Sequence, residues 1–373
     1  MQRDITSSAG QLLRALKLTL VMLLPWVVTL ASHAASGPSQ NVYIGARRLI
    51  AVDGTRRLNL VCMGHGEPTV IFDSGLSDWS FTWALVQPDV ARTTRACAYD
   101  RAGLGASDPT GRPADSRHMV DDLHLLLQRA GVDGALVLVG HSMGALNVRL
   151  YAALYPAQVA GMVLVDPAHE DAFSRIDAHR DQQETRRYAA QRAAASACVA
   201  DFVRRHASND WRARCIEPGD PRYDRSLNAA RRRVAGQLIY QRAQLDEITR
   251  YADGSSFAQL REARRSLGTL PLIVLTAQQT VLQGGDDWLD LHRELAAMSA
   301  LGRQRTIANA GHYIQLDRPD VVIDAIAEVI RTAPRYHRAQ PAVAPALATR
   351  PDAIPDNTPP CDTARIGPPA IRH

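Results

Sequence analysis

One serine in the middle of the chain stands between two glycines, directly after an apolar run. Residues 135–139 read ALVLV, residues 140–144 read GHSMG, and the residues that follow have helical character. This order predicts a buried strand that turns sharply into a helix and holds the Ser142 hydroxyl clear of the backbone. Glycine at positions 140 and 144 leaves room for neighbouring backbone to come close. Ser142 is therefore a candidate nucleophile.

Strands and helices alternate on both sides of this turn. Apolar strand-like runs occur at residues 49–52, 58–62, 69–72, 95–99, 135–139, 159–165, 270–275 and 305–308. Helical patterns follow several of them, including an amphipathic stretch from about Ser116 with Met119, Leu123, Leu126 and Leu127 on one face. Nearly continuous apolar strands are typical of a parallel sheet covered by helices on both faces. The fold class is therefore α/β with a mostly parallel central sheet.

A polar segment interrupts this alternation between residues 169 and 265. Glu, Asp, Arg, Gln and Ala dominate it, its patterns are helical, and it begins just after a strand ends. We expect a helical cap or lid over the site at the carboxyl edge of the sheet. A solvated helical excursion is the alternative. Residues 41–168 and 266–335 would then form the core.

The two ends of the chain differ from the core. Arg3, Arg14 and Lys17 precede or flank an apolar run at 18–30 and small residues up to 35, which is the layout of a secretory signal peptide. Residues 1–35 are predicted to be a signal peptide of a secreted or periplasmic protein, or an uncleaved N-terminal anchor that tethers it to a membrane. The Pro- and Ala-rich tail, residues 336–373, is predicted to be disordered. The net charge of +5 is spread along the chain, which argues against a nucleic-acid partner.

Five cysteines in an exported chain favour disulfides. Cys198 and Cys215 lie in the polar segment, where a bridge would hold a region without a large core. Cys62 and Cys97 lie in two strand-like runs and are either bridged or buried as thiols. Cys361 is left over. The cysteines lack metal-ligand spacing and the chain has no HExxH motif, so we expect no zinc site.

Four short motifs, in this order along the chain, resemble those of the α/β-hydrolase superfamily. They are the turn DSGL at 73–76, the run YDRAGLGAS at 99–107, the serine turn GHSMG, and the loop AGHY at 310–313. The resemblance covers roughly residues 41–333 and implies a catalytic serine, a histidine base, an inserted cap and no cofactor. It assigns the nucleophile to Ser142 and the base to His312.

The same resemblance implies an oxyanion hole made of two backbone amides, those of Met143 and Leu76. Many relatives carry His-Gly where this chain has Ser74 and Gly75. A backbone amide does not depend on the preceding side chain, so the hole is expected to survive this change. Asp100 and Arg101 are expected to brace the neighbouring loop.

The third member of the triad is less constrained. Relatives often place an acid after the strand that follows the cap, but residues 276–280 read TAQQT. We favour Asp166, at the end of the strand-like run 159–165, over Asp286 or Asp287, which are expected in a loop. His169 is expected to lie on the surface rather than in the pocket.

These residues together predict a serine hydrolase that cleaves a carboxylic ester or related acyl bond of a small-molecule substrate through an acyl-enzyme. A cofactor-free lyase or perhydrolase could use the same residues, and a non-catalytic binding module could use the same scaffold. A haloalkane dehalogenase is disfavoured, because it would carry an aspartate at position 142. The acyl-chain preference does not follow from the fold.

Overall fold

The computed structural model describes residues 40–44, 48–175, 178–205 and 208–333. The predicted signal peptide or anchor (1–35), the predicted tail (336–373) and Cys361 lie outside the described residues. Among the described helices, none combines the length and the apolarity needed to cross a membrane.

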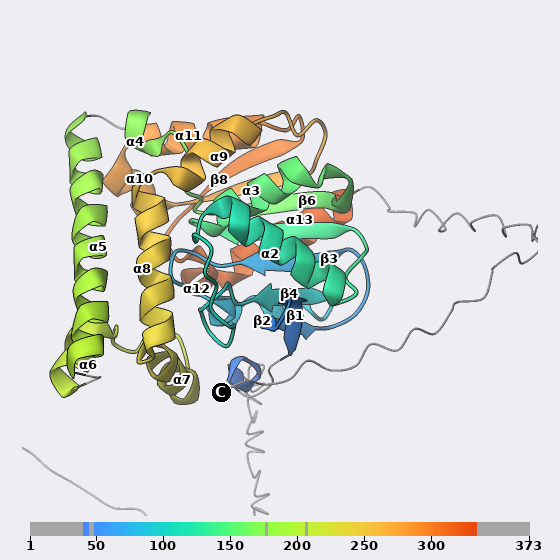
Figure 1. Cartoon of the computed structure of the whole chain (residues 1–373). Helices are drawn as coiled ribbons and strands as arrows, with labels where there is room; N and C mark the ends of the chain where they lie inside the picture. Colours follow the sequence, from blue (N-terminus) through green and yellow to red (C-terminus); the bar gives the residue numbers. More distant parts are fainter. Residues whose placement is uncertain (1–39, 45–47, 176–177, 206–207, 334–373) are drawn as a thin grey trace, which may run out of the picture.

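The core is an eight-stranded sheet in the order β1-β2-β4-β3-β5-β6-β7-β8 (Figure 1). Strand β2 is antiparallel to β1 and β4, and all other neighbours are parallel. The strands are β1 (Leu49–Asp53), β2 (Arg56–Met63), β3 (Thr69–Asp73), β4 (Ala96–Tyr99), β5 (Leu136–His141), β6 (Val159–Val165), β7 (Leu272–Ala277) and β8 (Gly302–Ile307). The predicted mostly parallel α/β sheet is confirmed.

The inner strands and the edge strand differ in sequence for a physical reason. All residues of β3 to β7 are buried, because helices cover both faces of the sheet. In β8 only Ile307 is buried. The strand begins at Gly302, earlier than the apolar pattern indicates, because an edge strand accepts polar side chains on its open side.

Helices on the two faces of the sheet bury two separate apolar clusters. One face packs against α2 (Ser116–Arg129), α3 (Gly144–Leu154), α9 (Ser255–Ala263) and α11 (Asp286–Ala297). The other packs against α1 (Gln87–Val90) and α13 (Pro319–Thr332). The short elements are η1 (Gln40–Tyr43), η2 (Ser80–Trp83), η3 (Pro156–Gln158), α10 (Gln278–Gly284) and α12 (Ile314–Asp317).

Helix α2 shows how the sequence sets one of these elements. The Asp115 side chain accepts a hydrogen bond from the His118 backbone N–H and caps the first turn. Met119, Leu123 and Leu126 are buried on the face toward the sheet, at the spacing of an amphipathic helix. The helix begins at Ser116, as the sequence predicts.

The described parts of the polar segment form six helices. They are α4 (Ala172–Arg175), α5 (Ala178–Arg205), α6 (Asn209–Cys215), α7 (Arg225–Ala235), α8 (Leu238–Ala252) and α9. Helices α5 to α8 stand together beside the sheet, with α5 and α8 packed along their lengths (Figure 1). Helix α9 instead buries Phe257 and Leu260 in the core and packs against α2 and α3. We use "cap" below for helices α5 to α8 and the described loops between them.

Two disulfides lie in the described residues. Cys62 and Cys97 are directly opposite each other on β2 and β4 and are bridged, so the thiol alternative left open by the sequence does not hold. Cys198 and Cys215 join the end of α6 to α5. Beside this second bridge, the buried Trp211 packs edge-on against Phe202 and donates its indole N–H to the Cys198 carbonyl oxygen at 2.8 Å.

Removing the Cys198–Cys215 bridge should destabilise the cap. The bridge closes a short loop, because its cysteines are 17 positions apart, and a loop of this size is expected to contribute about 3 kcal/mol. We expect the double variant Cys198→Ser, Cys215→Ser to unfold at a lower temperature, measured by circular dichroism. The exposed Ser196→Ala on the same helix is the control. Equal melting temperatures for both proteins would show that the bridge adds nothing.

Candidate active site

The turn between β5 and α3 holds Ser142 in a left-handed backbone conformation with a φ of +51°. A Cβ atom on Gly140 would lie 2.6 Å from the Gly144 carbonyl oxygen, and one on Gly144 would lie 2.5 Å from the Asp73 carbonyl oxygen. Both contacts are too close for any side chain. The two glycines therefore let the turn pack closely against β3. The left-handed conformation of the serine typically costs a residue other than glycine about 1–3 kcal/mol.

Asp166 and His312 are brought together from positions 146 residues apart. The His312 Nδ1 atom lies 2.7 Å from Asp166 Oδ2. Asp166 follows β6 directly, with a φ of +42°, and its side chain is buried. Neither Asp286 nor Asp287 makes this contact: both are exposed in the first turn of α11. The loop expected there is wrong, because acidic residues favour the N-terminal turn of a helix.

Asp166 is held as a carboxylate by several donors. Its Oδ1 accepts from the Ala277 N–H at 2.8 Å, and its Oδ2 accepts from Thr280 Oγ1 at 2.6 Å. Burial alone would raise the pKa of Asp166. The hydrogen bond from His312, the charges of His312 and His292 and the hydrogen bond from Thr280 together outweigh it, so the pKa lies below its ordinary value. A carboxylate in this state can orient an imidazole and stabilise its positive charge.

Two residues that support Asp166 were missed by the sequence reasoning. Thr280 lies in the TAQQT segment, where relatives often carry the acid, and supplies a hydroxyl donor instead. His292, on α11, lies with Nε2 2.9 Å from the Pro167 carbonyl oxygen and Nδ1 2.8 Å from Thr276 Oγ1. It thereby ties the turn after β6 to β7. No motif marks either residue, because their role arises only where the strand ends meet.

His141 fixes the loop that carries His312. Its Nε2 donates to the His312 carbonyl oxygen at 2.9 Å, and the two rings lie 4.7 Å apart. Burial, together with the neighbouring His312, lowers the pKa of His141 to about 3. His141 is therefore a neutral donor at ordinary pH. It positions the loop that carries His312.

Ser142 lies at the same edge of the sheet as Asp166 and His312. Its N–H donates to the Val165 carbonyl oxygen, the residue before Asp166, at 3.1 Å. Within the described part of the chain, the serine hydroxyl makes no hydrogen bond to the His312 ring. Catalytic hydrogen bonds often tighten only when substrate binds. The catalytic roles of the three residues remain predictions.

The loop after β3 runs beside the serine. A Cβ atom on Gly75 would lie 2.8 Å from His141 Nδ1 and 3.4 Å from Ser142 Cβ, so the Gly75–Leu76 peptide is next to the nucleophile. Among the described residues, the N–H groups of Leu76 and Met143 donate to no other group. Both amides are thus available for the oxyanion that the sequence predicts they bind.

The Arg101 side chain supports the loop after β3. Its guanidinium donates to the carbonyl oxygens of Ser74 at 2.7 Å and Gly75 at 2.6 Å, and pairs with Asp73 at 2.9 Å. It also pairs with Glu247 of α8 at 2.7 Å. All three charged side chains are buried. The bracing role expected for Arg101 is therefore seen, with a partner in the cap that the sequence did not indicate.

Glu247 completes the same arrangement from the cap side. One of its oxygens accepts from the Ser77 N–H at 2.7 Å. The residue thus contacts both the loop and the arginine that shapes it. Helix α8 is a fixed part of the site, because separating it would leave a buried arginine and a buried carboxylate without each other.

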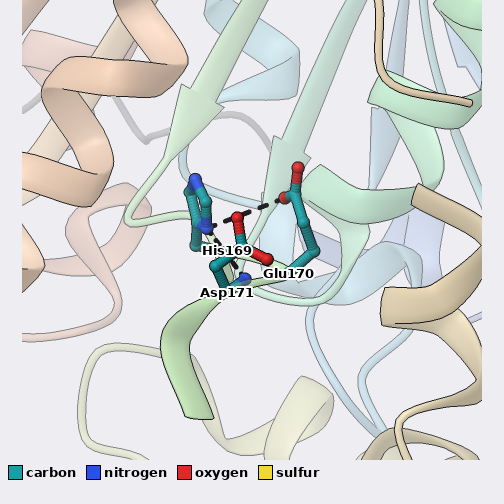
Figure 2. A group of neighbouring side chains, drawn as sticks. All are labelled: His169, Glu170 and Asp171. Carbon is teal, nitrogen blue, oxygen red and sulfur yellow. Dashed lines mark hydrogen bonds and ion pairs between the residues drawn. The ribbon is translucent and has the colours of Figure 1, made fainter. Parts of the chain in front are cut away.

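A second cluster of titratable groups lies in the segment after β6. His169, Glu170 and Asp171 offer ligand atoms within 4.8 Å of one another (Figure 2). Arg149 grips Glu170 with two hydrogen bonds of 2.7 and 2.8 Å, Arg261 pairs with Asp171, and His169 Nδ1 accepts from the Asp171 N–H. Arginine side chains pair with both carboxylates, so these residues form an ion-pair network. His169 is fully buried, and the expected surface position is wrong because this network encloses it.

Residues 59–319 match the family described as the alpha/beta hydrolase fold. The chain belongs to this family. The YqjL protein of Bacillus subtilis is 23% identical over 270 residues, covering 71% of this chain and 85% of YqjL. A cis-3-alkyl-4-alkyloxetan-2-one decarboxylase of Shewanella oneidensis is 29% identical over 126 residues, covering 32% and 38% of the two chains. The probable transporter efuK of Hormonema carpetanum is 31% identical over 163 residues, or 42% of this chain, but only 22% of efuK is covered.

Solved structures share the fold. An esterase of Thermogutta terrifontis superposes with a TM-score of 0.53 at 22% identity, covering 76% of this chain and 98% of the esterase. At this identity the likeness concerns the fold alone. The family supports an enzyme of the hydrolase class for this chain, and the residues of the site must supply the rest.

Replacing the buried acid tests the proposed triad. Asp166→Asn keeps the size of the side chain but removes the charge and can hold the wrong imidazole tautomer, so we expect kcat for an ester substrate to fall by roughly 10⁴. Asp286→Asn and Asp287→Asn are matched controls with near wild-type kcat. A large loss in either control, with Asp166→Asn close to wild type, would assign the acid to α11.

Replacing Glu247 tests the link from the cap to the oxyanion loop. Glu247→Gln weakens the hold on Arg101 and on the Ser77 amide, so the Leu76 N–H should be less well placed for the oxyanion. We expect kcat to fall at least about tenfold with little change in KM, because the lost interaction belongs to the transition state. Glu262→Gln, exposed on α9, is the control, and circular dichroism checks folding. A change in KM alone would contradict this role.

Proposed function

We propose that the protein is a serine hydrolase that cleaves a carboxylic ester, or a related acyl bond, of a small molecule. The observation that carries the proposal is that three features meet at one sheet edge: a strained serine turn, a buried carboxylate bonded to an imidazole, and two backbone amides with no acceptor among the described residues. Acyl transfer requires a nucleophile, a base with its orienting acid, and an oxyanion hole.

In the proposed mechanism, Ser142 Oγ attacks the carbonyl carbon while His312 Nε2 takes its proton. The Asp166 carboxylate stabilises the imidazolium, and the amides of Leu76 and Met143 bind the oxyanion. His312 then returns the proton to the leaving alcohol, which leaves an acyl group on Ser142. Water attacks this acyl-enzyme with His312 again as base, releasing the acid and restoring the serine.

The compartment is part of the proposal. Disulfides such as Cys62–Cys97 and Cys198–Cys215 persist in oxidising surroundings. They agree with a secreted or periplasmic protein, whether the N-terminal segment is cleaved or serves as a membrane tether.

A cofactor-free lyase is the second candidate, favoured by the likeness to the Shewanella decarboxylase. The two candidates differ in their products. An esterase should release p-nitrophenol from short p-nitrophenyl esters with multiple turnovers, whereas a dedicated lyase should barely act on them.

A fluorophosphonate probe tests the nucleophile directly. Such probes phosphonylate a serine that is paired with a base, so we expect one covalent adduct, located at Ser142 by peptide mapping. Ser142→Ala should remain folded and unlabelled. Labelling of another residue, or none in the folded wild type, would remove the serine-hydrolase proposal.

A further inference from the structure

A small cavity lies between the oxyanion loop and the cap. It has a volume of about 70 Å³, and Leu76 and Tyr313 both line it. Leu76 carries one of the proposed oxyanion amides, and Tyr313 follows His312. The cavity therefore neighbours the proposed site of reaction without being lined by Ser142 or His312, and a part of the substrate beyond the ester group would enter it.

Two residues that line this cavity each carry a polar atom without a partner. Asp78 Oδ2 and Arg231 Nε are both buried, and neither makes a hydrogen bond within the described residues. Nor does either side chain form an ion pair with another described residue. One carries an acceptor and the other a donor, and they come from the core loop and from α7 of the cap. Buried polar groups are normally hydrogen-bonded, so unpaired ones call for a ligand or water.

Both groups are held in place by their surroundings. The Arg231 guanidinium lies 4.7 Å from the Phe81 ring centre and 5.2 Å from that of Tyr223. Asp78 donates its N–H to the Gly75 carbonyl oxygen at 3.1 Å. Burial raises the pKa of Asp78 to about 6, although a hydrogen bond from Tyr313 and the charge of Arg231 oppose this rise. Asp78 is thus an ionised acceptor above that pH.

A hydroxyl group satisfies both atoms at once, because it donates one hydrogen bond and accepts others. The Arg231 Nη1 atom already donates to Asn228 Oδ1 at 3.2 Å, so an alkyl chain would leave only Asp78 Oδ2 and Arg231 Nε without partners. A water molecule needs about 10–15 Å³, so a cavity of about 70 Å³ has room for a hydroxyl and a few carbon atoms. A simple anion or cation fits this cavity less well than a hydroxyl group, because Asp78 and Arg231 carry opposite charges.

We propose that this cavity is a specificity site for a hydroxyl-bearing portion of the ester substrate, with Asp78 accepting from the hydroxyl and Arg231 donating to it. The inference rests on the proposed function, whose substrate class it narrows. It makes the enzyme one for hydroxylated esters rather than for plain fatty-acyl esters.

Two matched pairs of esters test this site from either side of the scissile bond. On the acyl side, p-nitrophenyl 3-hydroxybutyrate is compared with p-nitrophenyl butyrate. On the alcohol side, glycerol monobutyrate is compared with propyl butyrate. In at least one pair we expect kcat/KM to be about 10- to 100-fold higher for the hydroxylated ester. The reason is that the ester without the hydroxyl leaves the buried polar atoms of the cavity without hydrogen bonds.

The preference should depend on the two side chains. Asp78→Ala and Arg231→Met should each bring the ratio of kcat/KM within the pair close to one. Arg225→Met removes an exposed arginine from the same helix and should leave the ratio unchanged. Ratios near one in both pairs for the wild type, or ratios insensitive to Asp78→Ala and Arg231→Met, would overturn the proposal.

A binding measurement separates this proposal from the proposed function. Calorimetry on the Ser142→Ala protein, with glycerol monobutyrate and propyl butyrate as ligands, reports the cavity without hydrolysis. Tighter binding of glycerol monobutyrate, lost in the double variants Ser142→Ala, Asp78→Ala and Ser142→Ala, Arg231→Met, supports the cavity even if the wild type hydrolyses nothing. Equal binding of the two ligands, with Ser142-dependent hydrolysis intact, overturns the cavity alone and indicates that it holds only water. Should either pocket variant fail to fold, Asp78→Asn and Arg231→Lys replace it, each expected to reduce the preference.

Discussion

The Arg101 guanidinium is the interaction on which the architecture of the site depends. It is buried, and its partners come from three parts of the molecule: Asp73 at the end of β3, the carbonyl groups of the loop after β3, and Glu247 of the cap. A buried charge is costly unless every donor is paired. The loop, the sheet edge and α8 therefore share one arrangement in which the guanidinium is satisfied, and this arrangement leaves the Leu76 amide beside Ser142.

This dependence changes how the cap can work. A lid that lifted as one piece would separate Glu247 from Arg101 and draw α9 out of the core. Helices α8 and α9 are instead built into the site, α8 through Glu247 and α9 through Phe257 and Leu260. Control of substrate size would then come from the shape of the inner cap, where Arg231 and Tyr240 face the oxyanion loop, more than from opening and closing.

The acid shows how one family can place the same charge on different strands. The carboxylate must reach His312 Nδ1, and the ends of β6 and β7 lie side by side in the sheet. An acid after either strand can therefore serve the same imidazole. Here Asp166 comes from β6, and Thr280, just after β7, donates a hydrogen bond to it. The Thr280 hydroxyl thus supports the acid from the strand after which other members of the family carry the acid itself.

The sequence alone determined the strand order along the chain, the serine turn and the residues that form its surroundings. Apolar runs, glycine spacing and helix caps are local, and local patterns suffice to predict a mostly parallel sheet with Ser142 at a strand end. The sequence also favoured Asp166, because the carboxyl ends of parallel strands share an edge. It misplaced His169 and took Asp286 and Asp287 for loop residues. Only the tertiary structure decided the pairing of Cys62 with Cys97, the ion pair between Arg101 and Glu247, and the cavity that both Asp78 and Arg231 line. Each of these features joins residues that are far apart in the sequence. Packing and the need to pair buried charges decide which residues meet, and a local sequence pattern contains no information about either.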